Sequence, residues 1–225
     1  MIRAALTVAL ALVPAPVLAC RLALLLALDV SSSVNQREYL LQRNGLAAAL
    51  VAPEVVRAFL ASPEPVAIAA FEWSGQNNQS LVLPWQLIHS EADLLAAATR
   101  IGQTTRSETD FPTALGYALG HASKLLRQAP DCIRQTIDVS GDGESNDGFR
   151  PEHAYRHFPL DGVTVNALAI GASVGLDNLM VYFRQEVLRG PGAFVEAAAS
   201  YDDFERAMRR KLEREVASFA IGAAE

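Results

Sequence analysis

Seven apolar residues in succession, at positions 22–28, lead directly to a carboxylate, Asp29. An uninterrupted apolar run of this length, bounded by polar residues, is typical of a parallel strand that is buried on both faces. Five further segments have strand-like patterns, separated by turn-forming or helical segments. These predicted strands are residues 65–73, 80–88, 132–140, 162–171 and 192–198.

Helical patterns fill most of the intervals between these strands. Pro53 is suited to the first turn of a helix, where an N–H group would have no partner, and Ser90 is suited to cap another helix. Residues 102–110 and 141–153 are rich in polar and turn-forming residues, so we expect loops there. The predicted helices are residues 35–50, 53–61, 90–101, 111–127, 175–188 and 200–216.

The order of these elements predicts a single α/β domain. Residues 74–79 are dense in turn formers, so the strand after them returns antiparallel, and Pro84 within that strand favours an edge position. We expect a doubly wound, mostly parallel six-stranded sheet with one antiparallel edge strand and helices on both faces, a Rossmann-like architecture. Sheets of this kind bind ligands beyond the carboxyl ends of their strands.

The first nineteen residues differ from the rest of the chain. Arg3 is their only charged residue, and it precedes an apolar run, two prolines and a small residue, Ala19. This layout is typical of a secretory signal peptide that is cleaved after Ala19. The prolines and Arg21 leave the apolar stretch too short to span a bilayer comfortably. We therefore expect a signal peptide over residues 1–19 and the domain over residues 20–225.

The charge of the chain excludes one class of partner. Its 225 residues include 19 basic and 25 acidic residues, a net charge of −6 that becomes −7 once Arg3 leaves with the signal peptide. Nucleic-acid binding depends mainly on the neutralisation of phosphates by basic side chains, so an acidic chain without a basic run is not expected to bind nucleic acid. No later apolar segment is long enough for a transmembrane span.

The two cysteines, Cys20 and Cys132, bear on the location of the protein. In an exported protein an even number of cysteines suggests a disulfide, which forms in the periplasm or outside the cell. The alternative is a lipobox over residues 17–20 with a lipid attached to Cys20. Leu18 is unusual within such a motif, and no flexible tether separates Cys20 from the first strand. We expect a periplasmic or secreted protein, with lipoprotein attachment through Cys20 as the alternative.

Side-chain oxygens follow the first strand at alternate positions. Asp29, Ser31 and Ser33 occupy positions 1, 3 and 5 of this segment, and two distant loops offer the hydroxyl of Thr109 and the carboxylate of Asp142. Two carboxylates would neutralise a divalent cation, and hydroxyls would orient it without adding charge. Oxygen ligands of this kind are preferred by Mg²⁺, or by Mn²⁺ or Ca²⁺. The sequence therefore predicts a site for a divalent cation.

The spacing of these residues resembles the motif of the von Willebrand factor type A (vWA) domain. In that family, Asp-x-Ser-x-Ser follows the first strand, a threonine lies in a middle loop and an aspartate follows the fourth strand. The threonine match lies in TDFPTAL and the aspartate match in IDVSGDG, although the loop before the threonine lacks the family's usual glycines. The resemblance implies a metal-ion-dependent adhesion site (MIDAS) with these ligands: Asp29, Ser31, Ser33, Thr109 and Asp142.

The resemblance extends over about residues 20–220. The segments FEWSG (71–75), VLPWQLI (82–88) and IDVSGDGESNDG (137–148) look like a bacterial group of exported vWA proteins that is catalogued as a domain of unknown function. It implies an exported binding module whose cation engages an Asp or Glu carboxylate of a protein partner, with no reaction catalysed. Two alternatives stay open: a metal-assisted hydrolase that uses the same cation, and a structural scaffold with an empty site.

The resemblance also implies a pairing for the two cysteines. The family's sheet order places the first and fourth strands side by side and parallel. Cys20 precedes Asp29 by nine residues, and Cys132 precedes Asp142 by ten. If both aspartates lie at one edge of the sheet, both cysteines lie at the opposite edge on neighbouring strands, about 4.8 Å apart. We therefore expect a disulfide between Cys20 and Cys132.

Three further features have an open interpretation. His153 and His157 are four residues apart and could share a helix face, as a zinc-binding pair would, or form a solvated surface pair without a third ligand. Asp138, within the fourth strand, is either a buried carboxylate near the site or a cross-strand partner. Residues 205–215 have charged pairs at helical spacing, which favours a solvated helix face.

Overall fold

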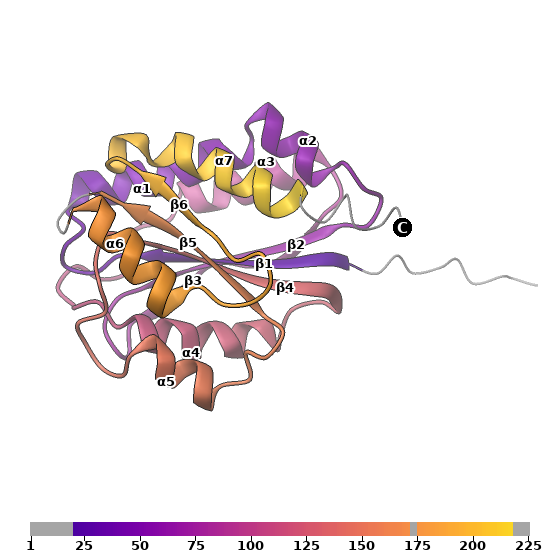
Figure 1. Cartoon of the computed structure of the whole chain (residues 1–225). Coiled ribbons are helices and arrows are strands. Elements are labelled where there is room, and N and C mark those ends of the chain that lie inside the picture. Colours follow the sequence, from indigo (N-terminus) through magenta and orange to yellow (C-terminus); the bar gives the residue numbers. More distant parts are fainter. Residues whose placement is uncertain (1–19, 172–174, 218–225) are drawn as a thin grey trace, which may run out of the picture.

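The computed structural model describes residues 20–171 and 175–217, which form a six-stranded sheet between two layers of helices (Figure 1). The predicted signal peptide lies outside the described residues. The strand order is β3-β2-β1-β4-β5-β6, with only the edge strand β3 antiparallel, so the predicted fold class is confirmed. The strands are β1 (Cys20–Asp29), β2 (Val66–Trp73), β3 (Gln79–Ile88), β4 (Cys132–Gly141), β5 (Thr164–Ile170) and β6 (Val195–Ala198).

Helices α1, α2, α3 and α7 cover one face of the sheet, and α4, α5 and α6 cover the other (Figure 1). A hydrophobic core lies on each face of the sheet, and alternate residues of β1 pack into one or the other. Leu24 and Leu26 pack on the α1 side, and Leu25 and Ala27 pack on the α4 side. The helices are α1 (Gln36–Leu50), α2 (Pro53–Phe59), α3 (Glu91–Gly102), α4 (Leu115–Leu126), α5 (Pro151–His157), α6 (Leu176–Tyr182) and α7 (Phe204–Ala217), with a π-helical turn (Phe183–Val187) and a 3₁₀ turn (Tyr201–Asp203).

Two helices differ from the sequence prediction. The helix expected over residues 111–127 begins only at Leu115, because the backbone before it pairs with another loop: the N–H of Ala114 donates to the carbonyl oxygen of Ser74 (3.0 Å). The loop expected after the fourth strand leads instead into α5, whose first turn holds Pro151. Both differences concern segments at the ends of strands, where contacts between loops decide the local structure.

The predicted disulfide between Cys20 and Cys132 is present. The two residues are direct partners in the register of β1 and β4, with their Cα atoms 4.3 Å apart. The bond lies at the end of the sheet opposite to Asp29 and uses the sulfur atom to which a lipid would be attached. Among the described residues, no helix has the length and apolar character that crossing a bilayer requires.

A lysine and two carboxylates are buried together between β4 and α7. Nζ of Lys211 lies 2.7 Å from Oδ1 of Asp138 and 2.6 Å from Oε1 of Glu215, and the Asn166 amide donates to the same Glu215 oxygen (2.8 Å). Lys211 is 0% exposed. The expectation that residues 205–215 form a solvated helix face is therefore wrong for Lys211 and Glu215. Their side chains contact side chains of β4 and β5 instead of solvent.

Candidate metal centre

The chain turns sharply after β1, and this turn presents several side-chain oxygens. Asp29, the last residue of β1, accepts a hydrogen bond at Oδ1 from the N–H of Ser31 (2.8 Å). The side-chain amide of Gln42 on α1 donates to the Asp29 carbonyl oxygen (2.9 Å) and thereby ties the turn to the helix. The N-cap of α1 is Asn35. The hydroxyls of Ser31 and Ser33 are therefore not needed to cap the helix and remain available for the cluster.

Three loops bring oxygen atoms together at the carboxyl end of the sheet. The hydroxyl of Ser33 donates to Oδ1 of Asp142, which directly follows β4 (2.7 Å). The hydroxyl oxygens of Ser31 and Ser33 are 3.1 Å apart, and the hydroxyl of Thr113, before α4, donates to that of Ser31 (3.2 Å). These contacts, with the turn at Asp29, place four of the five sequence-predicted ligands in one cluster.

Thr109, the fifth sequence-predicted ligand, lies outside this network of hydrogen bonds. Its side chain is exposed, and within the described part of the chain no hydrogen bond joins it to the cluster. Thr113, which sequence reasoning missed, is buried and contacts Ser31. The N–H of Thr113 donates to the side chain of Asn146 (2.9 Å), which fixes the threonine between two loops. The available signal was its position immediately before the Ala-Leu pair that opens α4.

The two carboxylates of the cluster are held in an environment poor in water. Asp29 is 0% exposed, and burial, followed by the charge of Asp142, raises its pKa to about 7. Burial also raises the pKa of Asp142. Arg106 lies nearby, but its guanidinium donates to the carbonyl oxygens of Val30 and Ser31 (2.9 and 3.0 Å), not to the carboxylates. A nearby cation would relieve the cost of holding both carboxylates in their charged form.

The composition of the cluster, which includes an unpaired buried oxygen, suits a cation that prefers oxygen ligands. Oδ2 of Asp29 is buried and has no hydrogen-bond partner among the described residues. Within that part of the chain there is no group of three or more His, Cys, Asp or Glu side chains that could hold a metal ion. The cluster offers two carboxylates and otherwise hydroxyls. An all-oxygen set of this composition suits Mg²⁺ or a similar hard cation better than a metal that prefers nitrogen or sulfur.

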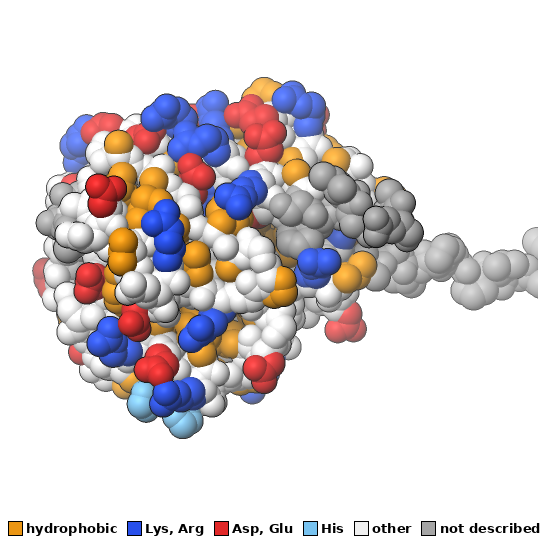
Figure 2. All heavy atoms as spheres, in the orientation of Figure 1, with side chains coloured by type: hydrophobic (Ala, Val, Ile, Leu, Met, Phe, Trp, Pro, Cys, Tyr) orange, Lys and Arg blue, Asp and Glu red, His pale blue; other side chains and the backbone are white. Residues whose placement is uncertain are grey.

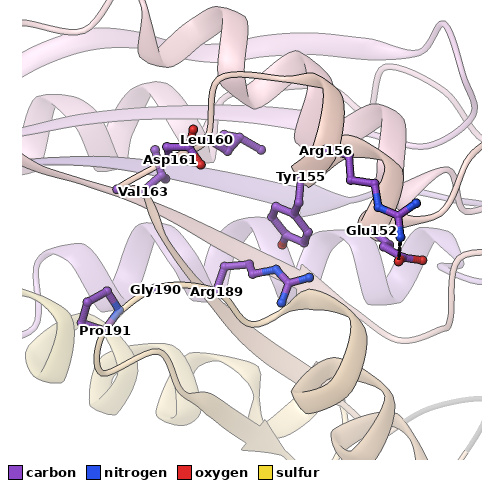
Figure 3. A pocket seen from close by; sticks show the side chains of 10 residues that line it. Glu152, Tyr155, Arg156, Leu160, Asp161, Val163, Arg189, Gly190 and Pro191 are labelled. Atoms are coloured by element: carbon purple, nitrogen blue, oxygen red, sulfur yellow. Dashed lines mark hydrogen bonds and ion pairs between the residues drawn. The ribbon is translucent and has the colours of Figure 1, made fainter.

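A separate cavity of about 440 Å³ lies at the other end of the sheet, where β5 begins. The guanidinium of Arg189 lies over the ring of Tyr155, with 4.6 Å between its Cζ atom and the ring centroid, and Arg156 forms an ion pair with Glu152 (Figure 3). The charged side chains that line this cavity balance one another, and none of them reaches the oxygen cluster. The cavity is therefore a distinct surface feature.

Comparison with known sequences identifies a family. The family described as "Protein of unknown function (DUF1194)" matches residues 19–220, which is most of the chain. Among curated proteins, none matches the sequence.

Comparison with solved structures identifies the fold as that of vWA domains. Proximal thread matrix protein 1 from the mussel byssus has a TM-score of 0.63 at 18% identity, covering 90% of this chain and 48% of that one. Another crystal of the mussel protein is described as having a zinc-occupied MIDAS motif (TM-score 0.60, 18% identity, 88% and 46% covered). This chain therefore spans about half the length of the mussel protein.

Two bacterial structures show the same fold. A von Willebrand factor type A protein from Catenulispora acidiphila has a TM-score of 0.54 at 18% identity, covering 89% of this chain and 43% of that one. The pilus adhesin SpaC from Lactobacillus rhamnosus GG has a TM-score of 0.63 at 13% identity, covering 89% and 31%. At these levels of identity the similarity concerns the fold alone.

Proposed function

We propose that this chain, which belongs to the DUF1194 family of proteins of unknown function and has a vWA-type domain, is an adhesion-type binding module that engages a protein partner through a divalent cation. The observation that carries the proposal is the convergence of three loops, which gathers Asp29, Ser31, Ser33, Thr113 and Asp142 at the carboxyl end of the sheet. Open α/β sheets bind their ligands at this end.

The proposed ligands contribute to cation binding in two different ways. Asp29 and Asp142 neutralise its charge, while the hydroxyls of Ser31 and Ser33 orient it without making it less electrophilic. The fifth oxygen comes from the loop before α4, from Thr109 by its motif or from Thr113 by its contact with Ser31. Bound Mg²⁺, Mn²⁺ or Ca²⁺ would supply a positive centre for an Asp or Glu carboxylate of the partner.

The structural neighbours and the cysteines support two further parts of the proposal. The zinc in the MIDAS motif of the mussel protein supports a divalent cation, and the description of SpaC as a pilus adhesin supports protein binding. The disulfide between Cys20 and Cys132 supports an oxidising compartment outside the cytoplasm. We therefore propose a periplasmic or secreted location, with residues 1–19 as the signal peptide and residues 20–225 as the vWA domain.

Calorimetric titration with Mg²⁺ or Mn²⁺ tests the metal site. We expect Asp29→Asn and Asp142→Asn each to weaken binding by at least about 100-fold, because changes outside a ligand set typically cost about 10–100-fold. Asp161→Asn is the matched control, since Asp161 is exposed at the other end of the sheet. Equal heats from wild type and Asp29→Asn, with both proteins folded by circular dichroism, would end the proposal.

The same titration assigns the fifth oxygen through two threonine variants. We expect Thr113→Val to weaken Mg²⁺ binding by about tenfold and Thr109→Val to change it by less than about twofold, because only Thr113 is buried against the cluster. The opposite order would give the role to Thr109, as the motif implies.

Acetate serves as a minimal probe of the partner's carboxylate. With Mg²⁺ bound, acetate should shift the amide NMR signals of Ser31, Ser32 and Gly143, which belong to the proposed ligands or to their neighbours in sequence, and EDTA should abolish these shifts. Chloride at the same ionic strength is the control. Acetate shifts that persist in EDTA would show that the carboxylate is bound without the cation and would contradict this mode of recognition.

A further inference from the structure

The exposed face of α5 has two neighbouring imidazoles. His153 and His157 are four residues apart on this helix, both are exposed, and their ring centroids are 5.2 Å apart with 35° between the ring planes. Figure 2 shows the histidine side chains at the surface where α5 lies in Figure 1. We propose that this pair is a second metal site, specific for a transition-metal ion with affinity for nitrogen, such as Zn²⁺, Ni²⁺ or Cu²⁺.

The separation of the rings matches that of two imidazoles on one metal ion. Zn–N bonds of about 2.0–2.1 Å in a tetrahedral site place two bound imidazole centroids about 5 Å apart. The separation of the His153 and His157 ring centroids is therefore compatible with binding of both rings to one ion. Residues four apart share one face of a helix, so the backbone of α5 supplies this spacing.

One of the two rings lies beside a cluster of aromatic rings. His153 lies 6.3 Å from the ring of Phe149, which stacks on Tyr117 at 4.2 Å and packs against Phe158 at 6.1 Å. Within the described part of the chain, neither imidazole ring takes part in a hydrogen bond or an ion pair, so the ring nitrogens are available. A ligand that is already oriented loses less conformational entropy when it binds a metal.

The surroundings of the pair do not oppose a cation strongly. Arg156 lies on the same helix, but it pairs with Glu152 on the side of α5 that faces the cavity of Figure 3. Two imidazoles leave further coordination positions to water. Because imidazole nitrogen suits zinc, nickel and copper while carboxylate and hydroxyl oxygens suit magnesium, the pair and the oxygen cluster select different ions.

A zinc competition titration of the untagged protein with a chromophoric indicator tests this site. In an Asp142→Asn background, which disables the proposed oxygen site, we expect one bound zinc ion. His153→Ala and His157→Ala should each weaken that binding by at least about tenfold, because the one imidazole that remains cannot chelate the ion. His89→Ala is the matched control: His89 is also exposed, and it lies next to α3.

Paramagnetic Ni²⁺ gives a second test that needs no variant. The NMR ring signals of His153 and His157 should broaden at lower Ni²⁺ concentration than those of His89, and excess Mg²⁺ should not reverse this. Equal zinc affinity after His157→Ala, an equal loss after His89→Ala, or no selective broadening would overturn the proposal. Failure of the magnesium titrations above would leave this test unaffected, so the two proposals are judged separately.

Discussion

Replacing both Cys20 and Cys132 by alanine lowers the free energy of unfolding by about 4–5 kcal/mol, the largest effect that we expect from any change in this protein. The disulfide joins residues 112 apart in sequence, so it removes a large share of the conformational entropy of the unfolded chain. Urea unfolding of the oxidised wild type and of the double variant, at one pH and temperature, measures the difference.

Reduction of the wild-type protein provides the control for this measurement. It removes the cross-link but keeps both sulfur atoms, so it separates the covalent effect from the packing effect of the smaller alanine side chains. We expect the reduced protein to unfold close to the double variant. A loss below about 1 kcal/mol in both cases would mean that pairing of β1 with β4 in the unfolded ensemble, or strain in the folded state, cancels the entropic gain.

Lys211→Met is expected to cost about 3–5 kcal/mol of unfolding free energy. Lys211 is the cation that lies between Asp138 and Glu215, and all three side chains are almost completely removed from water. Methionine has a similar length but no charge, so the two carboxylates would be left buried without compensation. Urea unfolding measures the loss, and Lys124→Met, the same substitution at an exposed lysine of α4, controls for the loss of a positive charge.

Glu215→Gln tests the contribution of one of the two carboxylates that contact Lys211. Burial, followed by the charge of Asp138, raises the pKa of Glu215 to about 7 from an ordinary value of 4.5. The folded chain thus holds this proton more tightly, and the stabilising contribution is complete below about pH 4.5 and lost as the pH rises through about 7. The free energy of unfolding of the variant should therefore be close to that of wild type at low pH. Above neutrality the variant should be more stable than wild type. A cost that grows with pH would contradict this assignment.

Much of the fold could be predicted because its central strand has an unambiguous signal. An apolar run such as residues 22–28 has few alternatives to a strand buried on both faces, and β1 is indeed buried along its whole length. Pro84 correctly indicated the edge strand, since a proline cannot donate to a further ladder of hydrogen bonds. The cysteine pairing followed once the order of the strands was implied by the family resemblance.

The missed features depend on contacts between segments that are distant in sequence. Thr113 lies before α4 because its loop pairs with the loops after β2 and β4, and no periodicity within residues 111–127 reveals those partners. Lys211 and Glu215 have the same four-residue spacing as an exposed ion pair. Only the position of Asp138 in the opposing sheet makes their burial possible, and a helical pattern alone does not contain that information.

The disulfide and the oxygen cluster lie at opposite ends of the same two parallel strands, β1 and β4. If the module holds a partner at the cluster while a pulling force acts on the disulfide end of the domain, mechanical tension runs along the strand axis. The hydrogen bonds between β1 and its neighbours are then loaded in shear, all together, instead of being unzipped one at a time. The covalent bond shares this tension between β1 and β4, so the sheet resists pulling best along the direction in which an adhesive contact would pull it.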